Sequence, residues 1–240
     1  MSMLRATNLS KSYGRRKVIS QFCMKVRKGD IYGFLGRNGQ GKTTVLRLLT
    51  GLARPDQGEV TIGGFSLKTD FKAAMTQLGA VVEAPALYGY LSGFENLMIA
   101  ARLSGHGKKE ALEALEATGL ESRANEKTKG YSFGMKQRLG LATAILGNPK
   151  LAILDEPLNG LDPQGVRETR ELIAQLASER GITFLISSHS LSDIEQISTR
   201  IGIIHEGRMA LEAGTEELKA SGKTLEEIYF GATGRGGHVA

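Results

Sequence analysis

Cysteine is scarce in this sequence and long apolar segments are missing. Cys23 is the only cysteine in 240 residues, so an internal disulfide is excluded and a reducing compartment is favoured. We expect Cys23 to be a small, buried, apolar residue. No uncharged apolar run approaches the ~18 residues of a membrane-spanning helix. Residues 1–5 lack the apolar core of a signal peptide. These absences predict a cytoplasmic chain that does not itself cross a membrane.

Motifs typical of nucleic-acid recognition are missing too. The net charge of +6 and the pI of about 9.4 suit nucleic acid or an anionic membrane surface. The basic residues are scattered, however, and the only dense cluster is residues 15–17. We interpret this cluster as a solvated basic turn beside a nucleotide or lipid surface, and we expect no nucleic-acid partner. With 41% hydrophobic and 23% charged residues, the composition is that of a globular protein.

Residues 36–44 match the phosphate-loop pattern of a glycine, four residues, then Gly-Lys-Thr. A strand-like apolar run (residues 31–35) precedes them and a helix-like run (residues 44–49) follows. Such a turn directs backbone N–H groups and the positive end of a helix dipole into one cavity. We therefore predict a nucleoside triphosphate site in which Lys42 reaches the β- and γ-phosphates and the Thr43 hydroxyl holds Mg²⁺. The expected nucleotide-binding residues here are Gly36, Arg37, Asn38, Gly39, Gln40, Gly41, Lys42, Thr43 and Thr44.

Candidate catalytic groups follow two further strand-like runs. Residues 151–154 contain no polar residue, which predicts a central parallel strand covered on both faces. Asp155 and Glu156 come next. We expect Asp155 to support the metal, and Glu156 to act as general base toward the attacking water. His189 follows the expected strand 183–186, at the end where α/β folds place ligand contacts, and is predicted to hydrogen-bond the γ-phosphate and the water.

Two more nucleotide contacts are expected from other parts of the chain. Tyr13 lies in a turn between the expected strands 4–9 and 17–26. A lone hairpin tyrosine is more often a packing residue, but beside a phosphate loop it favours stacking on adenine. Ser132 and Gly134 open a helix and present a hydroxyl and free N–H groups at its positive end. One nucleotide cannot easily use two helix N-termini so far apart in the chain, so we expect them to face a nucleotide held by another copy.

Alternating strands and helices around the phosphate loop predict an α/β fold with a doubly wound core. Within this single domain, we assign residues 1–82 and 150–213 to the core and an antiparallel β-subdomain. Residues 83–149, which are dominated by helical patterns, form an inserted α-helical subdomain. The last expected strand is 201–205, followed by a turn and a polar tail. In the tail (residues 214–240) we expect a helical piece at 224–230 and a disordered, glycine-rich end.

Together, in this order and spacing, these motifs resemble the ATP-binding subunit of ABC transporters, over roughly residues 4–213. The resemblance implies a P-loop NTPase (RecA-like) core that uses ATP and Mg²⁺. It also implies a head-to-tail dimer closing on two ATP molecules. Each ATP then lies between the phosphate loop of one copy and the signature of the other, which contains Ser132 and Gly134. Cleavage drives integral membrane permease subunits, so the resemblance places the chain on the inner face of the cell membrane.

Three positions depart from the usual family motifs. The signature usually reads Leu-Ser-Gly-Gly-Gln, whereas residues 131–135 read Tyr-Ser-Phe-Gly-Met, with Phe133 at the third position. Glu83 stands where a glutamine usually meets Mg²⁺ and the membrane subunit. It keeps an oxygen for the metal but adds a negative charge that bears on cleavage rate or coupling. Residues 159–162 read Asn-Gly-Leu-Asp in place of the frequent Ser-Ala-Leu-Asp.

The substrate class is indicated by two short stretches. Glu83 with residues 85–88, and the signature, look like the branch that exports bacitracin-type and lantibiotic peptides for resistance or self-protection. Exporters of sodium or other drugs remain alternatives. So do a soluble ABC ATPase acting on DNA or the ribosome, and a regulatory, weakly hydrolysing subunit.

Overall fold

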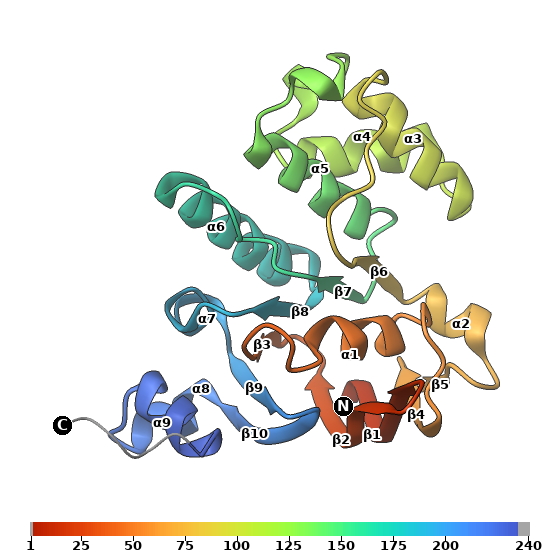
Figure 1. The fold of residues 1–240 in the computed structure, drawn as a ribbon. Helices are drawn as coiled ribbons and strands as arrows, with labels where there is room; N and C mark the ends of the chain where they lie inside the picture. The colour runs from red at the N-terminus through yellow and green to blue at the C-terminus, as the bar shows by residue number, and fades with distance from the viewer. Residues whose placement is uncertain (1, 235–240) are drawn as a thin grey trace.

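The computed structural model describes residues 2–234 (Figure 1). Its N-terminal part contains an antiparallel sheet of four strands. The strand order is β2-β1-β4-β5. The strands are β1 (Ser2–Tyr13), β2 (Arg16–Arg27), β4 (Gln57–Ile62) and β5 (Phe65–Ser66). The hairpin between β1 and β2 pairs Tyr13 with Arg16 around Gly14, whose φ is 58°. The predicted turn is therefore confirmed, and both strands run beyond the expected 4–9 and 17–26.

The predicted catalytic groups follow strands of a second, larger sheet. Its order is β10-β9-β3-β8-β7-β6, and only the β9–β10 pair is antiparallel. The strands are β3 (Ile31–Leu35), β6 (Leu78–Val81), β7 (Leu151–Leu154), β8 (Thr183–Ser188), β9 (Arg200–His205) and β10 (Arg208–Gly214). All four residues of β7 are buried, and β7 pairs with β6 and β8. It is thus the interior parallel strand that its apolar sequence predicts.

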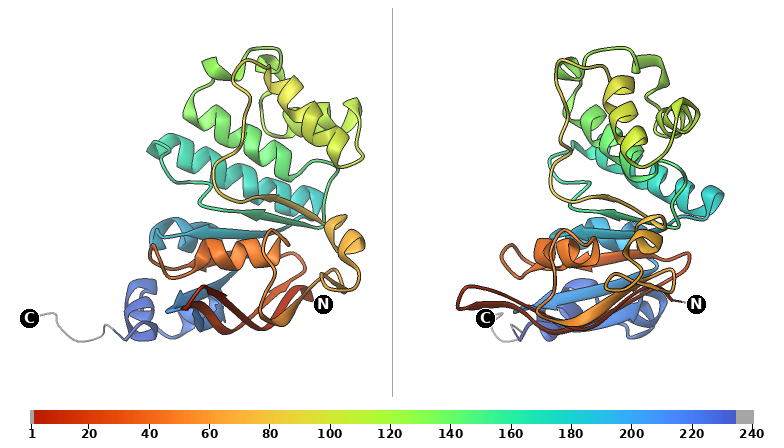
Figure 2. Two further views of the ribbon diagram at one scale, coloured as in Figure 1. Left: turned by 45° about the vertical axis from the view of Figure 1, so that its right-hand side comes forward. Right: turned by 90° about the vertical axis from the view of Figure 1, so that its right-hand side faces the viewer.

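Helices cover both faces of the larger sheet. Helix α1 (Lys42–Leu49) lies between the two sheets, while α6 (Pro163–Arg180) lies on the other side of the larger sheet (Figure 2). Alternate side chains of β3 divide between the two faces. Tyr32 and Phe34 join a core with α1, while Ile31 and Leu35 join a core with α6 and α7 (Leu191–Ile197). Period-two alternation of a sheet covered on both faces produces this division.

A group of helices stands beyond α6, at the top of Figure 1. It contains α3 (Gly93–Leu103), α4 (Lys108–Ala117), α5 (Phe133–Ala144) and two 3₁₀ turns (Glu121–Arg123 and Thr128–Gly130). The C-terminal end of helix α5 packs directly against the larger sheet. A Cβ added to Gly79 of β6 would lie only 1.7 Å from the Ala144 carbonyl oxygen. Only a glycine permits that approach. The inserted helical subdomain therefore rests directly on β6, which follows the short helix α2 (Phe71–Met75).

The C-terminal part differs from the sequence prediction. An unpredicted strand, β10, follows the predicted turn, and the predicted tail contains α8 (Thr215–Ala220) before the expected helix, which is α9 (Leu225–Ala232). Glu206 and Gly207 have φ values of 47° and 71°, a pair of positive values typical of a tight hairpin turn. The turn was predicted without its second strand because β10 is an edge strand whose side chains are all at least partly exposed. The expected disordered end concerns residues 235–240, which lie outside the described residues.

The prediction for Cys23 is wrong. This cysteine is exposed on β2, between the buried residues Phe22 and Met24. Strand side chains alternate between faces, so Cys23 points away from the core although both neighbours are apolar. Its Sγ accepts a hydrogen bond from the Asn8 N–H at 3.3 Å. Among residues 2–234 no helix is long and apolar enough to cross a membrane.

Candidate active site

The phosphate loop turns into α1 through glycines in left-handed conformations. Gly39 and Gly41 have φ values of 81° and 104°, and Gly41 is the N-cap of α1. The backbone conformation of Gly41 favours glycine, and a Cβ there would also lie 2.7 Å from Cδ1 of Ile19, which would have to shift. The first N–H groups of a helix have no partner within it. Here they open, with the positive end of the helix dipole, onto a cleft of about 820 Å³.

Residues from five parts of the chain line this nucleotide cleft. Among the predicted site residues, it is lined by Arg37, Asn38, Gly39, Gly41, Lys42, Thr43, Thr44, Glu83, Asp155 and Glu156. Six other predicted residues do not belong to its lining: Tyr13, Gly36, Gln40, Ser132, Gly134 and His189. The structure thus brings most of the phosphate loop together with both carboxylates of the β7 end, as the order of parallel strands predicts.

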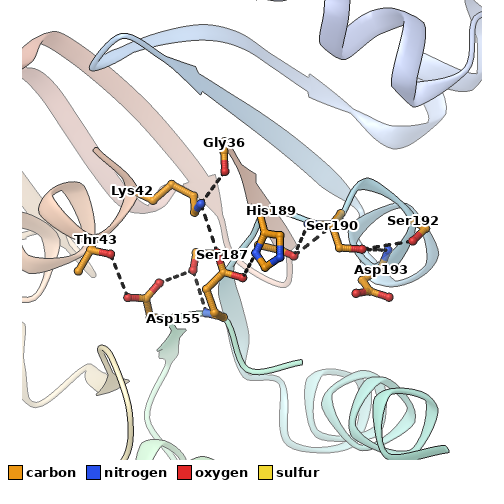
Figure 3. Close-up of polar contacts among 11 residues, drawn as sticks. Gly36, Lys42, Thr43, Asp155, Ser187, His189, Ser190, Ser192 and Asp193 are labelled. Carbon is orange, nitrogen blue, oxygen red and sulfur yellow. Dashed lines mark hydrogen bonds and ion pairs between the residues drawn. The ribbon is translucent and has the colours of Figure 1, made fainter. Parts of the chain in front are cut away.

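Glu156, which lines the cleft, contacts two cationic or protonatable side chains, Lys42 and His189. Its Oε1 lies 3.2 Å from Lys42 Nζ, and its Oε2 lies 2.8 Å from His189 Nδ1 (Figure 3). Since a carboxylate only accepts, His189 Nδ1 carries the proton in this contact. Lys42 Nζ also donates to the Gly36 carbonyl oxygen at 2.5 Å. Glu156 has a φ of 49°, an uncommon value for a non-glycine residue that places its side chain among these partners.

Asp155 contacts two hydroxyl groups. Ser187 Oγ, at the end of β8, donates to Asp155 Oδ1 at 2.5 Å and accepts from the Glu156 N–H at 2.9 Å. Thr43 Oγ1 lies 3.4 Å from Asp155 Oδ2 (Figure 3). A carboxylate and a hydroxyl facing one cleft form the all-oxygen donor set that suits Mg²⁺. The residues present therefore fit a magnesium ion, although no group of three or more His, Cys, Asp or Glu gathers as a metal site within residues 2–234.

The Glu83 carboxylate faces a positively charged side chain of the same chain. It forms an ion pair with the Arg47 guanidinium of α1. The hydrogen bond and negative charge of Glu83 raise the pKa of Arg47, and Tyr13 contributes in the same direction. Glu83 also has a φ of 70°. It lines the cleft beside the phosphate loop, but its charge is balanced by Arg47 rather than directed at Asp155.

Three residues predicted to bind the nucleotide make other contacts. Gln40 accepts the Glu206 N–H on its side-chain oxygen at 2.6 Å and the Gly207 N–H on its carbonyl oxygen at 3.2 Å. It thereby ties the phosphate loop to the β9–β10 turn. Gly36 contributes its carbonyl to Lys42. Tyr13 is 48% exposed, and Lys11 Nζ lies 5.5 Å from its ring centroid. The ring of Tyr13 thus presents surface to solvent at the end of the hairpin.

Ser132 and Gly134 lie on a separate surface. They line a second cavity of about 600 Å³, together with Gly160, Leu161 and Asp162 of the loop after β7. Ser132 is the N-cap of α5, and its Oγ accepts the Met135 N–H at 3.2 Å. The hydroxyl proton is still available to a ligand. Within one chain, therefore, the two helix N-termini open onto different cavities.

Sequence reasoning missed several residues of the site. Ser187 follows an apolar strand in a Ser-Ser-His run, and its position beside His189 was the available signal. Arg16 lines the nucleotide cleft; the basic cluster was recognised, but the residue that faces the cleft was not identified. Lys136 and Gln137 of α5 also line it. They come from the helical subdomain, so only the three-dimensional arrangement shows them.

An α/β core with a phosphate loop, a carboxylate pair at a strand end and a histidine at the next one defines a P-loop nucleoside triphosphatase. A model of the ABC transporter family matches residues 19–159, more than half of the chain. The chain belongs to this family and is an ATP-hydrolysing subunit of an ABC transporter. The resemblance and the fold class predicted from the sequence are confirmed.

Relatives and solved structures agree with this assignment. The chain is 47% identical to the bacitracin transport ATP-binding protein BcrA of Bacillus licheniformis, covering 95% of this chain and 75% of that protein. It is 40% identical to the lantibiotic transport ATP-binding protein SrtF of Streptococcus pyogenes, covering 95% and 96%. An ATP-binding subunit of an ABC transporter superposes with a TM-score of 0.85 at 28% identity, covering 96% and 99%. A dimeric ATP-binding cassette in a post-hydrolysis state with ADP and Pi gives 0.80 at 25% identity, covering 89% and 99%.

Proposed function

We propose that two copies of the chain enclose two ATP molecules, each between the nucleotide cleft of one copy and the Ser132–Gly134 surface of the other. The observation that carries this proposal is the separation of the two cavities within one chain. A helix N-terminus with a free hydroxyl proton suits a phosphate, yet Ser132 does not line the cleft that holds Lys42. The dimeric cassette among the solved structures supports a two-copy arrangement.

Glu156 acts as the general base in this proposal. In the structure Lys42 Nζ lies close to Glu156 Oε1, so the lysine and the carboxylate neutralise each other before a phosphate arrives. Entry of the β- and γ-phosphates draws Lys42 toward the nucleotide, because a phosphate offers more negative charge than one carboxylate. Glu156 is then free to accept a proton from the attacking water. His189 keeps its Nδ1–H on Glu156 and thereby fixes the orientation of the carboxylate.

Thr43 and Asp155 are the residues that would hold Mg²⁺ in this proposal. The ion supplies charge stabilisation to the phosphate oxygens when bound. The protein's own part is to hold the oxygens in place. Ser187 donates to Asp155 Oδ1 and leaves Oδ2 facing Thr43. Glu83 reaches the same region only after its pairing with Arg47 is broken.

Replacing Glu156 by glutamine tests the base assignment. We expect Glu156→Gln to lower ATP turnover by about 100-fold or more, the range that loss of a general base produces. ATP-dependent dimers should accumulate in the variant and be detectable by light scattering after size-exclusion chromatography. Glu59→Gln, which changes an exposed carboxylate of β4, is the matched control and should retain wild-type turnover. Hydrolysis at the wild-type rate in Glu156→Gln would show that another group is the base.

The proposed cargo is an antimicrobial peptide, exported for resistance or self-protection. The support comes from the relatives named for bacitracin and lantibiotic transport and from the Glu83 and signature stretches. The chain then acts at the cytoplasmic face of the membrane through integral permease subunits. Growth inhibition by bacitracin, a lantibiotic and sodium chloride, compared between a wild-type and a Glu156→Gln strain, identifies the cargo class. Sensitisation to sodium alone would instead favour the sodium-exporter alternative.

A further inference from the structure

Two positions that depart from the usual family motifs lie against each other. Phe133 opens α5, whereas Gly160 belongs to the loop that follows β7. A Cβ placed on Gly160 would lie 3.1 Å from Cε1 and 3.3 Å from Cζ of Phe133. The aromatic ring therefore rests on the backbone of Gly160. Phe133 stands where the family usually has glycine. It faces Gly160, which stands where the family frequently has alanine.

Gly160 suits this contact in two ways. Its φ is 78°, in the left-handed region that a side chain makes unfavourable. A methyl group at 3.1 Å from the ring would also be closer than the ~3.5–4.0 Å at which carbon atoms attract each other. An alanine here would force the ring of Phe133 to move. The two residues are thus complementary in size.

Neighbouring contacts join the same two segments. A Cβ on Gly134 of α5 would lie 3.5 Å from Leu161 Cδ2, an ordinary packing distance. Further along α5, Arg138 forms an ion pair with Glu168 of α6. Asp162 caps α6 with its side chain, so the loop is fixed at its far end as well. The N-terminus of α5 and the loop after β7 therefore pack as one unit.

The ring of Phe133 also stands between the two cavities. Phe133 is 52% exposed and lines both the nucleotide cleft and the second cavity. Asn159, which precedes Gly160 in the chain and also lines the cleft, donates its N–H to the Glu156 carbonyl oxygen at 3.1 Å. In the second cavity Phe133 adjoins Ser132. A continuous path of contacts therefore runs from the proposed base to the surface proposed to face the partner's ATP.

We propose that Phe133 is a positioning residue that makes the loop after Glu156 and the N-terminus of α5 move together, and so couples the two ATP sites of the dimer. This inference rests on the proposed function, in which Ser132 acts on the nucleotide of the other copy. When the loop moves with Glu156 in one site, the Phe133–Gly160 contact shifts Ser132 in the other site. Hydrolysis is therefore cooperative in ATP.

A double-mutant cycle on the full chain tests the contact. Turnover and the Hill coefficient for ATP are measured for the wild type, Phe133→Ala, Gly160→Ala and the double variant. Gly160→Ala should lower both quantities. Its effect on turnover should be smaller by about fivefold in the Phe133→Ala background, a size typical of coupling between contacting residues. The backbone strain of alanine at position 160 is present in both backgrounds and cancels in the cycle.

Gly181→Ala is the matched control. Gly181 also has a positive φ, of 65°, but an added Cβ there would meet nothing within 4 Å. Its effect should therefore simply add to that of Phe133→Ala. Phe133→Ala alone should reduce the Hill coefficient toward ~1 while the KM for ATP changes less than about twofold, a split that loss of stability would not produce.

Three results would overturn the inference. They are additive effects of Phe133→Ala and Gly160→Ala, an unchanged Hill coefficient in Phe133→Ala, and a wild type without cooperativity. If Gly160→Ala does not fold, Phe133→Gly, which restores the usual family residue, gives the same test through the Hill coefficient alone. Whether Glu156→Gln forms ATP-dependent dimers distinguishes a failure of this inference from a failure of the proposed function. If that variant forms ATP-dependent dimers while the cycle is additive, only the role of Phe133 is rejected.

Discussion

At the scale of single residues, Glu83 is the position whose surroundings bear most on the turnover rate. Its carboxylate pairs with Arg47, and both side chains are substantially exposed. Such an exposed pair contributes little to stability, because water screens the two charges. Its effect therefore belongs to the chemistry of the cleft. While Arg47 holds Glu83, the oxygen predicted to reach Mg²⁺ is engaged elsewhere.

We expect Glu83→Gln to raise ATP turnover. A neutral amide forms no ion pair with Arg47, so its oxygen is free for the metal, and we expect a rise of about fivefold. The measurement is the steady-state ATPase rate over a range of Mg²⁺ concentrations. The Mn²⁺ concentration that half-saturates the site, measured by electron paramagnetic resonance, gives a second reading that does not depend on turnover.

Arg47→Met provides the comparison for this prediction. It frees the Glu83 carboxylate without removing its charge, so Mn²⁺ should bind more tightly while turnover rises less than in Glu83→Gln. Glu121→Gln, a change in a 3₁₀ turn of the helical subdomain, should alter neither quantity. An equal, brisk rate in the wild type and Glu83→Gln would remove the idea that this residue makes the subunit a slow hydrolase.

Residues that belong to a contiguous motif were predictable, and residues that act from a distance were not. Lys42, Thr43 and Asp155 line the cleft, because the phosphate loop and the β7 end each fix their own local geometry. Arg47 and Ser187 were missed. Each is an ordinary residue within its element, and only the packing of α1 and β8 brings it to Glu83 or Asp155.

At the scale of secondary-structure elements, one carboxylate joins the two sheets. Glu212 lies on β10, and its Oε1 accepts from the buried Tyr32 hydroxyl at 2.8 Å. The same oxygen accepts from the Lys25 N–H of β2 at 2.9 Å. Tyr32 reaches across β9 because Gly202 has no side chain; a Cβ there would lie 2.1 Å from the tyrosine oxygen. The edge strands β2 and β10 are thus held together through Tyr32 and Glu212.

Tyr32→Phe is expected to destabilise the fold at neutral pH. The variant leaves Glu212 short of one donor, a loss of about 1–3 kcal/mol in the free energy of unfolding. Burial, followed by the charge of Glu212, raises the pKa of Tyr32 well above its usual value of 10.0. A group whose folded pKa is raised contributes stability that is complete below the unfolded pKa and is lost as the pH rises toward the folded pKa.

The wild type should therefore lose stability above pH ~10 more steeply than Tyr32→Phe, by up to about 1.4 kcal/mol per pH unit. Urea unfolding at several pH values between neutral and strongly alkaline measures this difference. Tyr90→Phe is the control, since Tyr90 is 68% exposed, and it should follow the wild type at every pH. Parallel curves for wild type and Tyr32→Phe would show that Tyr32 ionises equally in both states.

Elements with strong local signals agree with the sequence prediction, and those that depend on partners do not. Strand β7 is fully apolar, and α1 ends at Leu49, with Thr50 as its C-cap before Gly51, whose φ is 72°. Both signals lie within the element. Strand β10 was missed because it is held in place by its pairing with β9 and by the hydrogen bond of Glu212 to β2. Neither contact can be recognised from its own sequence. The fold class was predictable, whereas the strand that closes one edge of the sheet was not.

At the scale of the whole molecule, the segment between β6 and α3 joins the core to the helical subdomain and also lines the nucleotide cleft. Glu83, Leu87 and Gly89 of this segment belong to the cleft lining. Between and beside them, Tyr88 and Tyr90 are exposed and stack edge to face with ring centroids 6.0 Å apart. A partner that binds the two rings would press on residues that line the ATP site. Exposed aromatic residues of this kind are typical of interface anchors.

We therefore expect the tagged full chain to recover an integral membrane protein from detergent-solubilised membranes of its own organism. Replacing both Tyr88 and Tyr90 by serine should reduce that recovery by about tenfold, since each loss of an aromatic anchor costs ~1 kcal/mol or more. The ATPase rate of the isolated variant should stay within about twofold of the wild type, because neither residue belongs to the lining of the nucleotide cleft. Phe65→Ser, at an exposed aromatic residue of β5, is the matched control and should leave recovery unchanged. Recovery of ribosomes or DNA, with no membrane protein, would instead support the soluble ABC ATPase alternative and would contradict coupling to a permease.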